Sequence, residues 1–302
     1  PITGRREFKT WWTGNEALKT GVRVTFRPSL WGGPDNTMIP HSRVLAGAAA
    51  GYLLTGDAAA GEVARTFALG ESATMLGMVW NAQDAVRSIM ARAVVPPNQV
   101  VSLPGAREAA TDFGRWRQAS CAWNTCWIEV EDNPYWGDIW VKNKRSKDDV
   151  PHIYRAAVWL RFLSERAEDQ GIREAATEAW HLLQGFAQDI VDHGYAIRTK
   201  DDQGQIFTPN QDLANFTMYM ALDPLAECPA RLSTALLATG TRLGIDCGTG
   251  YLGPYEEFSF LANYYNLHIL RGFHGAALLL ALSSGRNEAA LALLGGMADR
   301  AD

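Results

Sequence analysis

Residues 146–163, SKDDVPHIYRAAVWLRFL, and residues 174–195, EAATEAWHLLQGFAQDIVDHGY, decide the fold that the sequence predicts. Pro151 is best tolerated in the first turn of a helix, so the first stretch predicts a helix over about 148–168. The second stretch predicts a helix over about 171–193, because its closing DHGY is a helix-stop signal. Together they form an antiparallel helical hairpin.

Further helical patterns recur along the chain with Gly, Pro or Ser between them. Residues 71–92 are compatible with a helix, and residues 196–207 indicate a small β-hairpin that turns at 201–204. The other predicted helices cover residues 42–54, 57–70, 212–222, 229–243, 256–270, 272–283 and 287–301. Strand signals stay short and scattered, so we expect a mainly α protein built from antiparallel hairpins.

This layout resembles the α/α toroids. HSRVLAGAAAGYLLTGD at 41–57, followed by a second helix, and the hairpin above are similar to their successive outer and inner helices. The resemblance covers most of residues 41–300 and implies an (α/α)-toroid-like barrel with Trp-rich loops and minor β structure. We expect an N-terminal arm or cap at 1–40, and a single helical domain at 41–302 with a loop-rich insertion at about 96–147.

The insertion begins after Pro96-Pro97 and holds five of the eleven Trp residues. It is too long for a structureless loop. Residues 112–117 and the SCAWNTCWIEVE segment at 120–131 are compatible with short strands or with a broken helix.

Composition restricts the classes of partner. The chain of 302 residues has a net charge of −5, and its main basic run is KNKR at 142–145. That run is compatible with a solvated turn or an anion contact, and it is too short to follow a nucleic-acid backbone. No apolar run reaches the roughly 18 residues of a membrane span. We therefore expect neither nucleic-acid binding nor a membrane span.

Four cysteines form two pairs that are close in sequence, Cys121 with Cys126 and Cys228 with Cys247. Disulfides between them would suit the periplasm or the cell exterior, which is the expected location. The alternative is a cytoplasmic protein with four buried thiols.

The resemblance to α/α toroids implies a carbohydrate-active enzyme, because glycoside hydrolases, unsaturated-glucuronyl hydrolases and polysaccharide lyases use that architecture. The eleven Trp residues agree with a carbohydrate substrate, since indole faces stack on sugars. They are equally compatible with loops fastened to a helical body. Fold alone does not establish function, so the residues must carry the assignment.

Hydrolysis of a glycosidic bond requires two carboxyl groups across the sugar, one protonated and one ionised. Asp148 and Asp149 supply one candidate group, and Glu256 and Glu257 supply the other. All four are also explained as helix-capping residues. We favour hydrolysis over elimination, because the overall negative charge does not indicate a basic groove for a polyuronate.

Elimination would require a Tyr or His base and groups that neutralise a uronate carboxylate. His152, Tyr264 and His268 are the candidate bases. The predicted cleft is formed by residues 31–43, 136–155 and 255–274. Its expected substrate-binding residues are Trp31, His41, Arg43, Trp136, Trp140, Tyr154, Arg155, Asn263, Asn266, Arg271 and His274.

Three alternatives stay open. We expect no cofactor, although Asp148 and His152 have the i, i+4 spacing of metal ligands and the turn at Asp201-Asp202 would suit Ca²⁺. A non-catalytic helical protein that binds a glycan or a partner protein also fits the Trp-rich loops. The third alternative is a helical enzyme for a small apolar or terpenoid substrate.

Overall fold

The computed structural model describes residues 38–95, 100–101, 109–110, 127–208, 229–239 and 260–298. Only the backbone is described at 95, 100–101, 109–110, 229–230, 239, 260–270 and 296–298. The helices in these ranges are α1 (Met38–Thr55), α2 (Ala58–Leu76), α3 (Val150–Arg166), α4 (Gln170–Asp192), α5 (Pro229–Thr239), α6 (Phe260–Ser283) and α7 (Asn287–Ala298). The strands are β1 (Ala91–Val95), β2 (Val100–Val101), β3 (Ala109–Ala110), β4 (Trp127–Asn133), β5 (Gly137–Lys144), β6 (Thr199–Lys200) and β7 (Ile206–Phe207).

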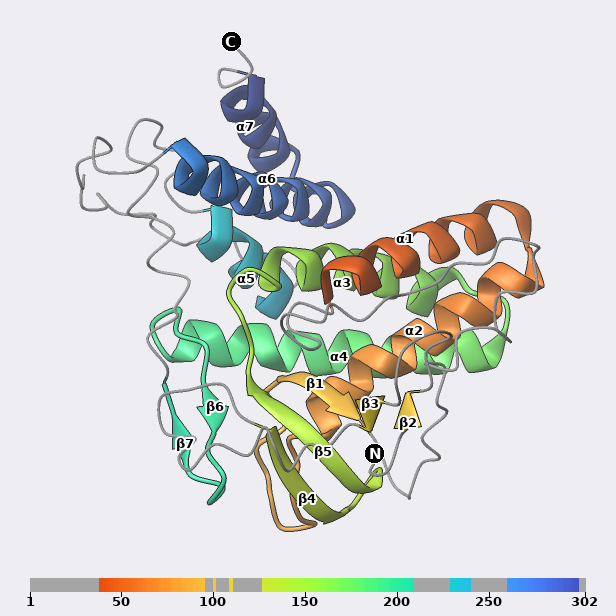
Figure 1. The fold of residues 1–302 in the computed structure, drawn as a ribbon. Helices are drawn as coiled ribbons and strands as arrows, with labels where there is room; N and C mark the ends of the chain where they lie inside the picture. Colours follow the sequence, from red (N-terminus) through yellow and green to blue (C-terminus); the bar gives the residue numbers. More distant parts are fainter. Residues whose placement is uncertain are drawn as a thin grey trace.

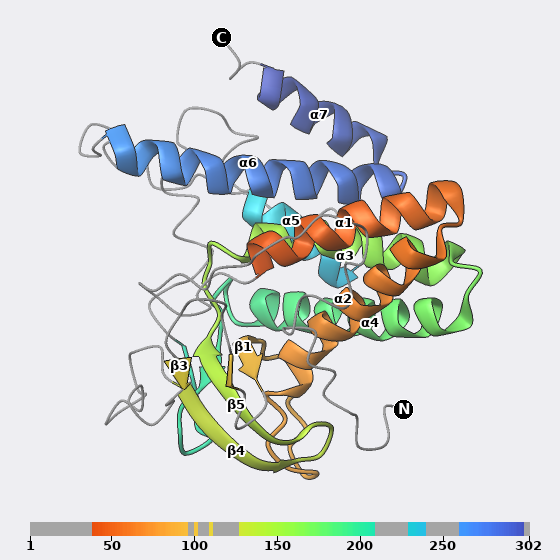
Figure 2. The same ribbon diagram turned by 45° about the vertical axis from the view of Figure 1, so that its right-hand side comes forward.

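The helices pack as hairpins in two rows. In one row α1 packs on α3 and α3 packs on α6, and in the other α2 packs on α4 and α4 packs on α5. The hairpins α1–α2 and α3–α4 connect the two rows, as does the contact between α5 and α6. Figure 1 and Figure 2 both show α6 on one side of α3 and α4 on the other. The prediction of a mainly helical protein with minor β structure is confirmed, and the described sheets are antiparallel.

The α3–α4 hairpin forms for the reasons that its sequence indicates. Pro151 lies in the first turn of α3, where a missing N–H costs nothing. Asp169 caps α4, since its Oδ1 accepts a hydrogen bond from the N–H of Ile172 at 2.9 Å. The buried side chains of α4 follow the helical period and include Ala176, Leu183 and Ile190. This hairpin supplies much of the hydrophobic core.

Helix α6 is one continuous helix, so the predicted break between residues 270 and 272 is wrong. A Cβ added at Gly272 would lie 2.9 Å from the Cβ of Pro151. Gly272 is therefore a position where α6 approaches the first turn of α3 closely, and it does not end the helix.

Replacing Gly272 with Ala should destabilise the protein by about 1–3 kcal/mol, because the new methyl group would overlap Pro151. Gly275→Ala is the matched control on the same helix. Its Cβ would lie 3.7 Å from Arg155, an ordinary contact, so it should be neutral or stabilise by up to about 1 kcal/mol. Urea unfolding of both variants measures the difference, and equal stabilities would contradict the close-packing interpretation.

The prediction that residues 71–92 are helical is correct only up to Leu76, where α2 ends. From Ala91 the chain forms β1, which pairs with β5 in an antiparallel sheet of order β1-β5-β4. The β4–β5 hairpin occupies the described end of the predicted insertion, which favours strands over a broken helix there. The sheet lies at the end of the molecule opposite to α7 (Figure 1).

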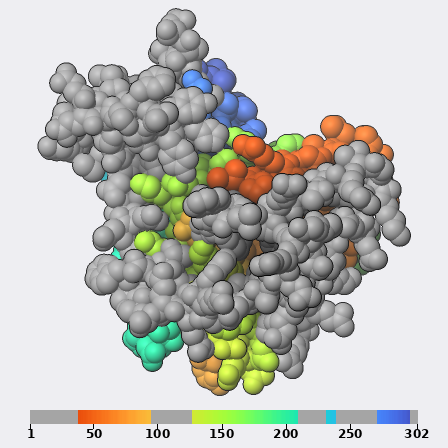
Figure 3. All heavy atoms as spheres, in the orientation of Figure 1, coloured from red at the N-terminus to blue at the C-terminus, as the bar shows by residue number. Residues whose placement is uncertain are grey.

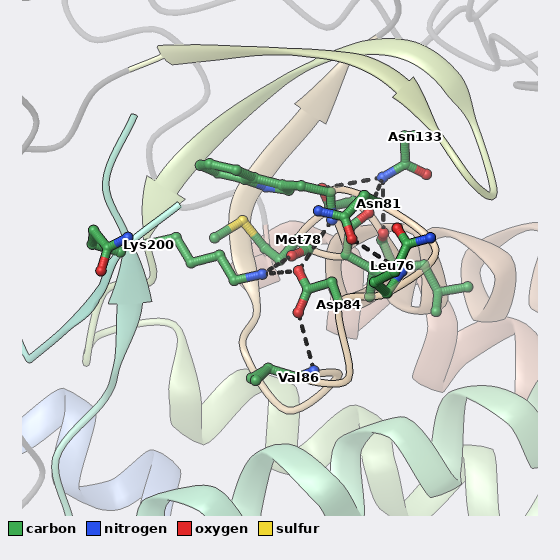
Figure 4. Close-up of polar contacts among 12 residues, drawn as sticks. Leu76, Met78, Asn81, Asp84, Val86, Asn133 and Lys200 are labelled. Carbon is green, nitrogen blue, oxygen red and sulfur yellow. Dashed lines mark hydrogen bonds and ion pairs between the residues drawn. The ribbon is translucent and has the colours of Figure 1, made fainter. Parts of the chain in front are cut away.

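Asn133 fastens this hairpin to the end of α2. Its Nδ2 donates hydrogen bonds to the carbonyl oxygens of Leu76 at 3.1 Å and Val79 at 2.8 Å. Its Oδ1 accepts hydrogen bonds from the N–H groups of Tyr135 at 2.9 Å and Trp136 at 3.0 Å. A single buried amide therefore satisfies the backbone on both sides of the junction (Figure 4).

Lys200, in β6, binds the loop that connects α2 to β1 (residues 77–90). Its ammonium donates to the carbonyl oxygen of Met78 at 2.7 Å, pairs with Asp84 and lies 5.4 Å from the centre of the Trp80 ring. The predicted β-hairpin at 196–207 is confirmed as β6–β7, and it carries this lysine. The loop after α2 is thus tied to two separate hairpins.

Among the described helices, none has the combined length and apolar character that crossing a membrane requires. The predicted helix at 212–222 lies outside the described residues.

Candidate functional site

Four buried ionisable side chains meet between the first helical hairpin and the start of α3. We call them the buried charge cluster: His41 from α1, Glu71 from α2, Arg145 from the β5–α3 connection, and Asp149 at the start of α3. His41 is 8% exposed and the other three are 0% exposed. Ionisable side chains are almost never buried to this extent unless they are paired or functional.

Arg145 is the centre of this cluster. Its Nη1 donates a hydrogen bond to Asp149 Oδ2 at 2.9 Å, and its Nη2 donates to the backbone carbonyl oxygen of Ala91 in β1. The guanidinium therefore joins the first turn of α3 to the edge of the sheet. Its complete burial excludes the solvated-turn interpretation for this residue of the KNKR run.

Asp149 occupies the N-cap position of α3 but does not act as a side-chain cap. Its φ and ψ are −80° and −29°, which is helical, and its carboxylate makes no capping hydrogen bond. Oδ2 bonds to Arg145, and Oδ1 makes no hydrogen bond within the described part of the chain. The capping explanation is therefore wrong for Asp149, whose carboxylate serves the cluster.

Glu71 is held in its protonated form. Burial raises the pKa of Glu71 to about 8; the positive charge of Arg145 opposes this rise and the negative charge of Asp149 adds to it. Neither carboxyl oxygen makes a hydrogen bond to a described residue, although Oε1 lies 3.5 Å from His41 Nε2. At neutral pH Glu71 is thus a buried carboxylic acid.

His41 stays neutral for the same reason. Burial lowers its pKa to about 3, a backbone hydrogen bond with Phe67 opposes this, and Arg145 lowers the pKa further. The imidazole also lies against the Phe67 ring, with 4.7 Å between the ring centroids. A second neutral titratable group therefore lies beside Glu71.

Burial raises the pKa of Asp149, and the guanidinium of Arg145 opposes that rise. Because a guanidinium stays charged in proteins, Arg145 and Asp149 form a buried ion pair. The cluster then holds one cation, one anion, one neutral acid and one neutral imidazole. A carboxyl group that keeps its proton at neutral pH beside an ionised one is an arrangement that can serve general acid catalysis.

Among the other predicted residues of this region, Asp148 and His152 lie beside Asp149. Asp148 is half-buried, and its N–H donates to Ser146 Oγ at 3.2 Å. His152 is 3% exposed. Within the described ranges, no group of three His, Cys, Asp or Glu side chains is arranged to hold a metal ion.

The predicted substrate-binding residues divide between the core and the surface. Tyr154 is in the core, where its hydroxyl shares a hydrogen bond of 2.8 Å with Thr234 Oγ1 and burial raises its pKa. His274 is buried, Trp136, Trp140 and Arg155 are half-buried, and Arg43 and Arg271 are exposed. The space-filling view shows α1, which carries Arg43, at the surface of one face (Figure 3).

The remaining predicted residues are not described as side chains. Trp31, Glu256, Glu257 and all four cysteines lie outside the described residues. Asn263, Tyr264, Asn266 and His268 lie in the part of α6 where only the backbone is described. The convergence of Asp148 and Asp149 with Glu256 and Glu257 stays a prediction.

Sequence reasoning missed Glu71 and Arg145 as site residues. A signal for Glu71 was present, because it continues the buried stripe of α2 formed by Ala64, Ala68 and Met75 at helical spacing. A carboxyl group on the apolar face of a helix is buried when the helix packs. Arg145 gave no such signal, since it belongs to a basic run before a helix.

No family model, curated protein or solved structure matches the chain in comparisons with known proteins.

The cluster predicts how stability depends on pH. Between pH 4.5 and about 8 the unfolded chain releases the Glu71 proton and the folded protein keeps it, so the free energy of unfolding falls as pH rises. Between about pH 3 and 6.5 unfolding adds a proton to His41, so the free energy of unfolding rises with pH. From pH 4.5 to 6.5 the two slopes oppose each other.

Glu71→Gln should abolish the decrease in the free energy of unfolding with pH, a slope of up to about 1.4 kcal/mol per pH unit. The increase that depends on His41 should remain. Urea unfolding over a pH series measures both curves. Glu62→Gln, at a largely exposed position on the same helix, is the control and should follow the wild type. Parallel curves for wild type and Glu71→Gln between pH 6.5 and about 8 would contradict a protonated Glu71.

Proposed function

We propose that this protein is a glycoside hydrolase that cleaves a polysaccharide or oligosaccharide, with Glu71 as its general acid. The observation that carries the proposal is a pair of buried carboxyl groups in different protonation states. Glu71 has a pKa of about 8, and Asp149 is held as an anion by Arg145 at 2.9 Å. Cleavage of a glycosidic bond needs a protonated carboxyl group for the leaving oxygen and an ionised one for the sugar.

Each residue of the pair has a defined role in this proposal. Glu71 gives its proton to the leaving oxygen, and the nearby charge of Arg145 stabilises the carboxylate that remains. Asp149 keeps Oδ2 on Arg145, while Oδ1 is available to orient a water molecule or to face the positive charge that develops on the sugar ring. Arg145 is a positioning residue for both.

The arrangement of the helices supports the carbohydrate class. The rows α1-α3-α6 and α2-α4-α5 are connected by hairpins, which is the layout expected of an (α/α)-toroid-like barrel. We propose that the rows continue into such a barrel and that the protein acts in the periplasm or outside the cell. Because Glu71 and Asp149 are fully buried, the proposed reaction also requires a movement that admits the sugar to the cluster.

The test is turnover on a panel of neutral and uronic-acid polysaccharides. Reducing ends and the ultraviolet absorbance of unsaturated products are followed together, for wild type and for Glu71→Gln and Asp149→Asn. We expect reducing ends without absorbance, and a loss of about 10²–10⁴-fold in each variant, the usual contribution of a general acid or base. Glu62→Gln should retain wild-type turnover.

Three outcomes would contradict the proposal. Rising absorbance would replace hydrolysis with elimination. Full turnover in Glu71→Gln and Asp149→Asn would show that the buried charge cluster has a structural role and no catalytic one. Binding of a polysaccharide without any product would favour a non-catalytic glycan-binding protein.

A further inference from the structure

His41 reaches Glu71 across the α1–α2 hairpin. Its Nε2 lies 3.5 Å from Glu71 Oε1, and both side chains are buried. Phe67, one helical turn before Glu71 in α2, makes a backbone hydrogen bond with the imidazole. The same helix therefore supplies a backbone contact for His41 and the carboxyl group that faces it.

These contacts select one tautomer of the imidazole. A neutral imidazole carries one N–H donor and one acceptor nitrogen. The backbone hydrogen bond with Phe67 raises the pKa of His41, which is the effect of a carbonyl oxygen that accepts from an imidazole N–H. Nε2 is the nitrogen that faces Glu71, so we assign the N–H that meets Phe67 to Nδ1. The proton therefore lies on Nδ1, and Nε2 presents its lone pair to Glu71. A carboxylic acid at Glu71 supplies the O–H that this lone pair accepts.

We propose that His41 is a positioning residue for Glu71, whose carboxylic O–H it accepts in a hydrogen bond at Nε2. At 3.5 Å the two atoms do not form a hydrogen bond in the structure, so the proposed bond requires the two side chains to approach each other. The bond favours the protonated form of Glu71 and fixes the direction of its O–H. The inference rests on the proposed function for the catalytic use of that proton. The bond itself rests on the position of Nε2 opposite Glu71, on the Phe67 contact of the imidazole and on a protonated Glu71.

The charges around the pair are compatible with this assignment. Arg145 acts on both groups, since its positive charge disfavours imidazolium at His41 and opposes the raised pKa of Glu71. Asp149 acts on Glu71 in the opposite direction. Arg92 acts on Arg145 and Asp149. Next to the Arg145 guanidinium, a neutral His41 that accepts at Nε2 is therefore compatible with a protonated Glu71.

Two variants of His41 separate its contacts. In His41→Asn the amide reaches the place of Nδ1 and keeps the contact with Phe67, whereas in His41→Gln the longer amide reaches the place of Nε2 and keeps an acceptor for Glu71. The readout is the pH at which the Glu71-dependent fall in unfolding free energy ends. We expect this pH to move down by about one unit in His41→Asn, the worth of one hydrogen bond, and to stay near the wild-type value in His41→Gln.

Nitrogen-15 NMR of histidine in the wild-type protein tests the tautomer directly, with His41→Asn identifying the signal among the six histidines. We expect a neutral imidazole at pH 7 with its proton on Nδ1. A proton on Nε2, an imidazolium, or equal pH shifts in the two variants would overturn the inference.

These measurements do not depend on turnover. If the tautomer is as expected and no polysaccharide is cleaved, the bond stands and the proposed reaction fails. If polysaccharide is cleaved by a protein whose His41 carries its proton on Nε2, the reaction stands and this inference fails.

Discussion

The buried guanidinium of Arg145 is the interaction on which the centre of this protein depends. It bonds to Asp149 at the start of α3 and to the carbonyl oxygen of Ala91 in β1, and so fixes the small sheet against the helical body. Removing one partner of a buried ion pair leaves an uncompensated charge, so neither Arg145 nor Asp149 can change alone without a large cost. The same charge sets the electrostatics for Glu71 and His41.

The position of these residues explains why a carboxylic acid can persist there at neutral pH. The guanidinium of Arg145 is already paired with the carboxylate of Asp149. Ionising Glu71 would therefore add a second negative charge to a buried site, where water does not screen it. His41 cannot supply the missing positive charge, because its own burial keeps it neutral. A protonated acid beside a fixed carboxylate follows from this arrangement, and it is the feature from which the glycoside hydrolase proposal is built.

The local parts of the fold were predictable from the sequence. The hairpin of α3 and α4 follows from the position of Pro151, the cap at Asp169 and the periodic apolar residues of α4. Long-range packing was not predictable. From the sequence, Gly272 suggests a break between two helices. In the structure it lies inside α6, where a side chain would overlap Pro151. Residues 91–95 form a strand because β5 is available to pair with them.

The candidate site shows the same division. The sequence places His41 before one predicted helix and Asp149 in the first turn of another, but their partners come from distant parts of the chain. Glu71 and Arg145 converge with them only when α1, α2 and the sheet pack together. From the sequence, helix capping explains Asp149 adequately. The missing capping hydrogen bond and the bond to Arg145 are what identify it as a member of a buried cluster.

The most direct test of the account is an infrared titration of the folded protein, with the spectrum of Glu71→Gln subtracted from that of the wild type. A protonated Glu71 predicts a carboxylic acid band in this difference at pH 6 that disappears with a midpoint near pH 8, the pKa of about 8 that burial gives Glu71. A carboxylate band in its place at pH 6 would show that Glu71 is ionised in the folded protein. Its role as a general acid would then be contradicted.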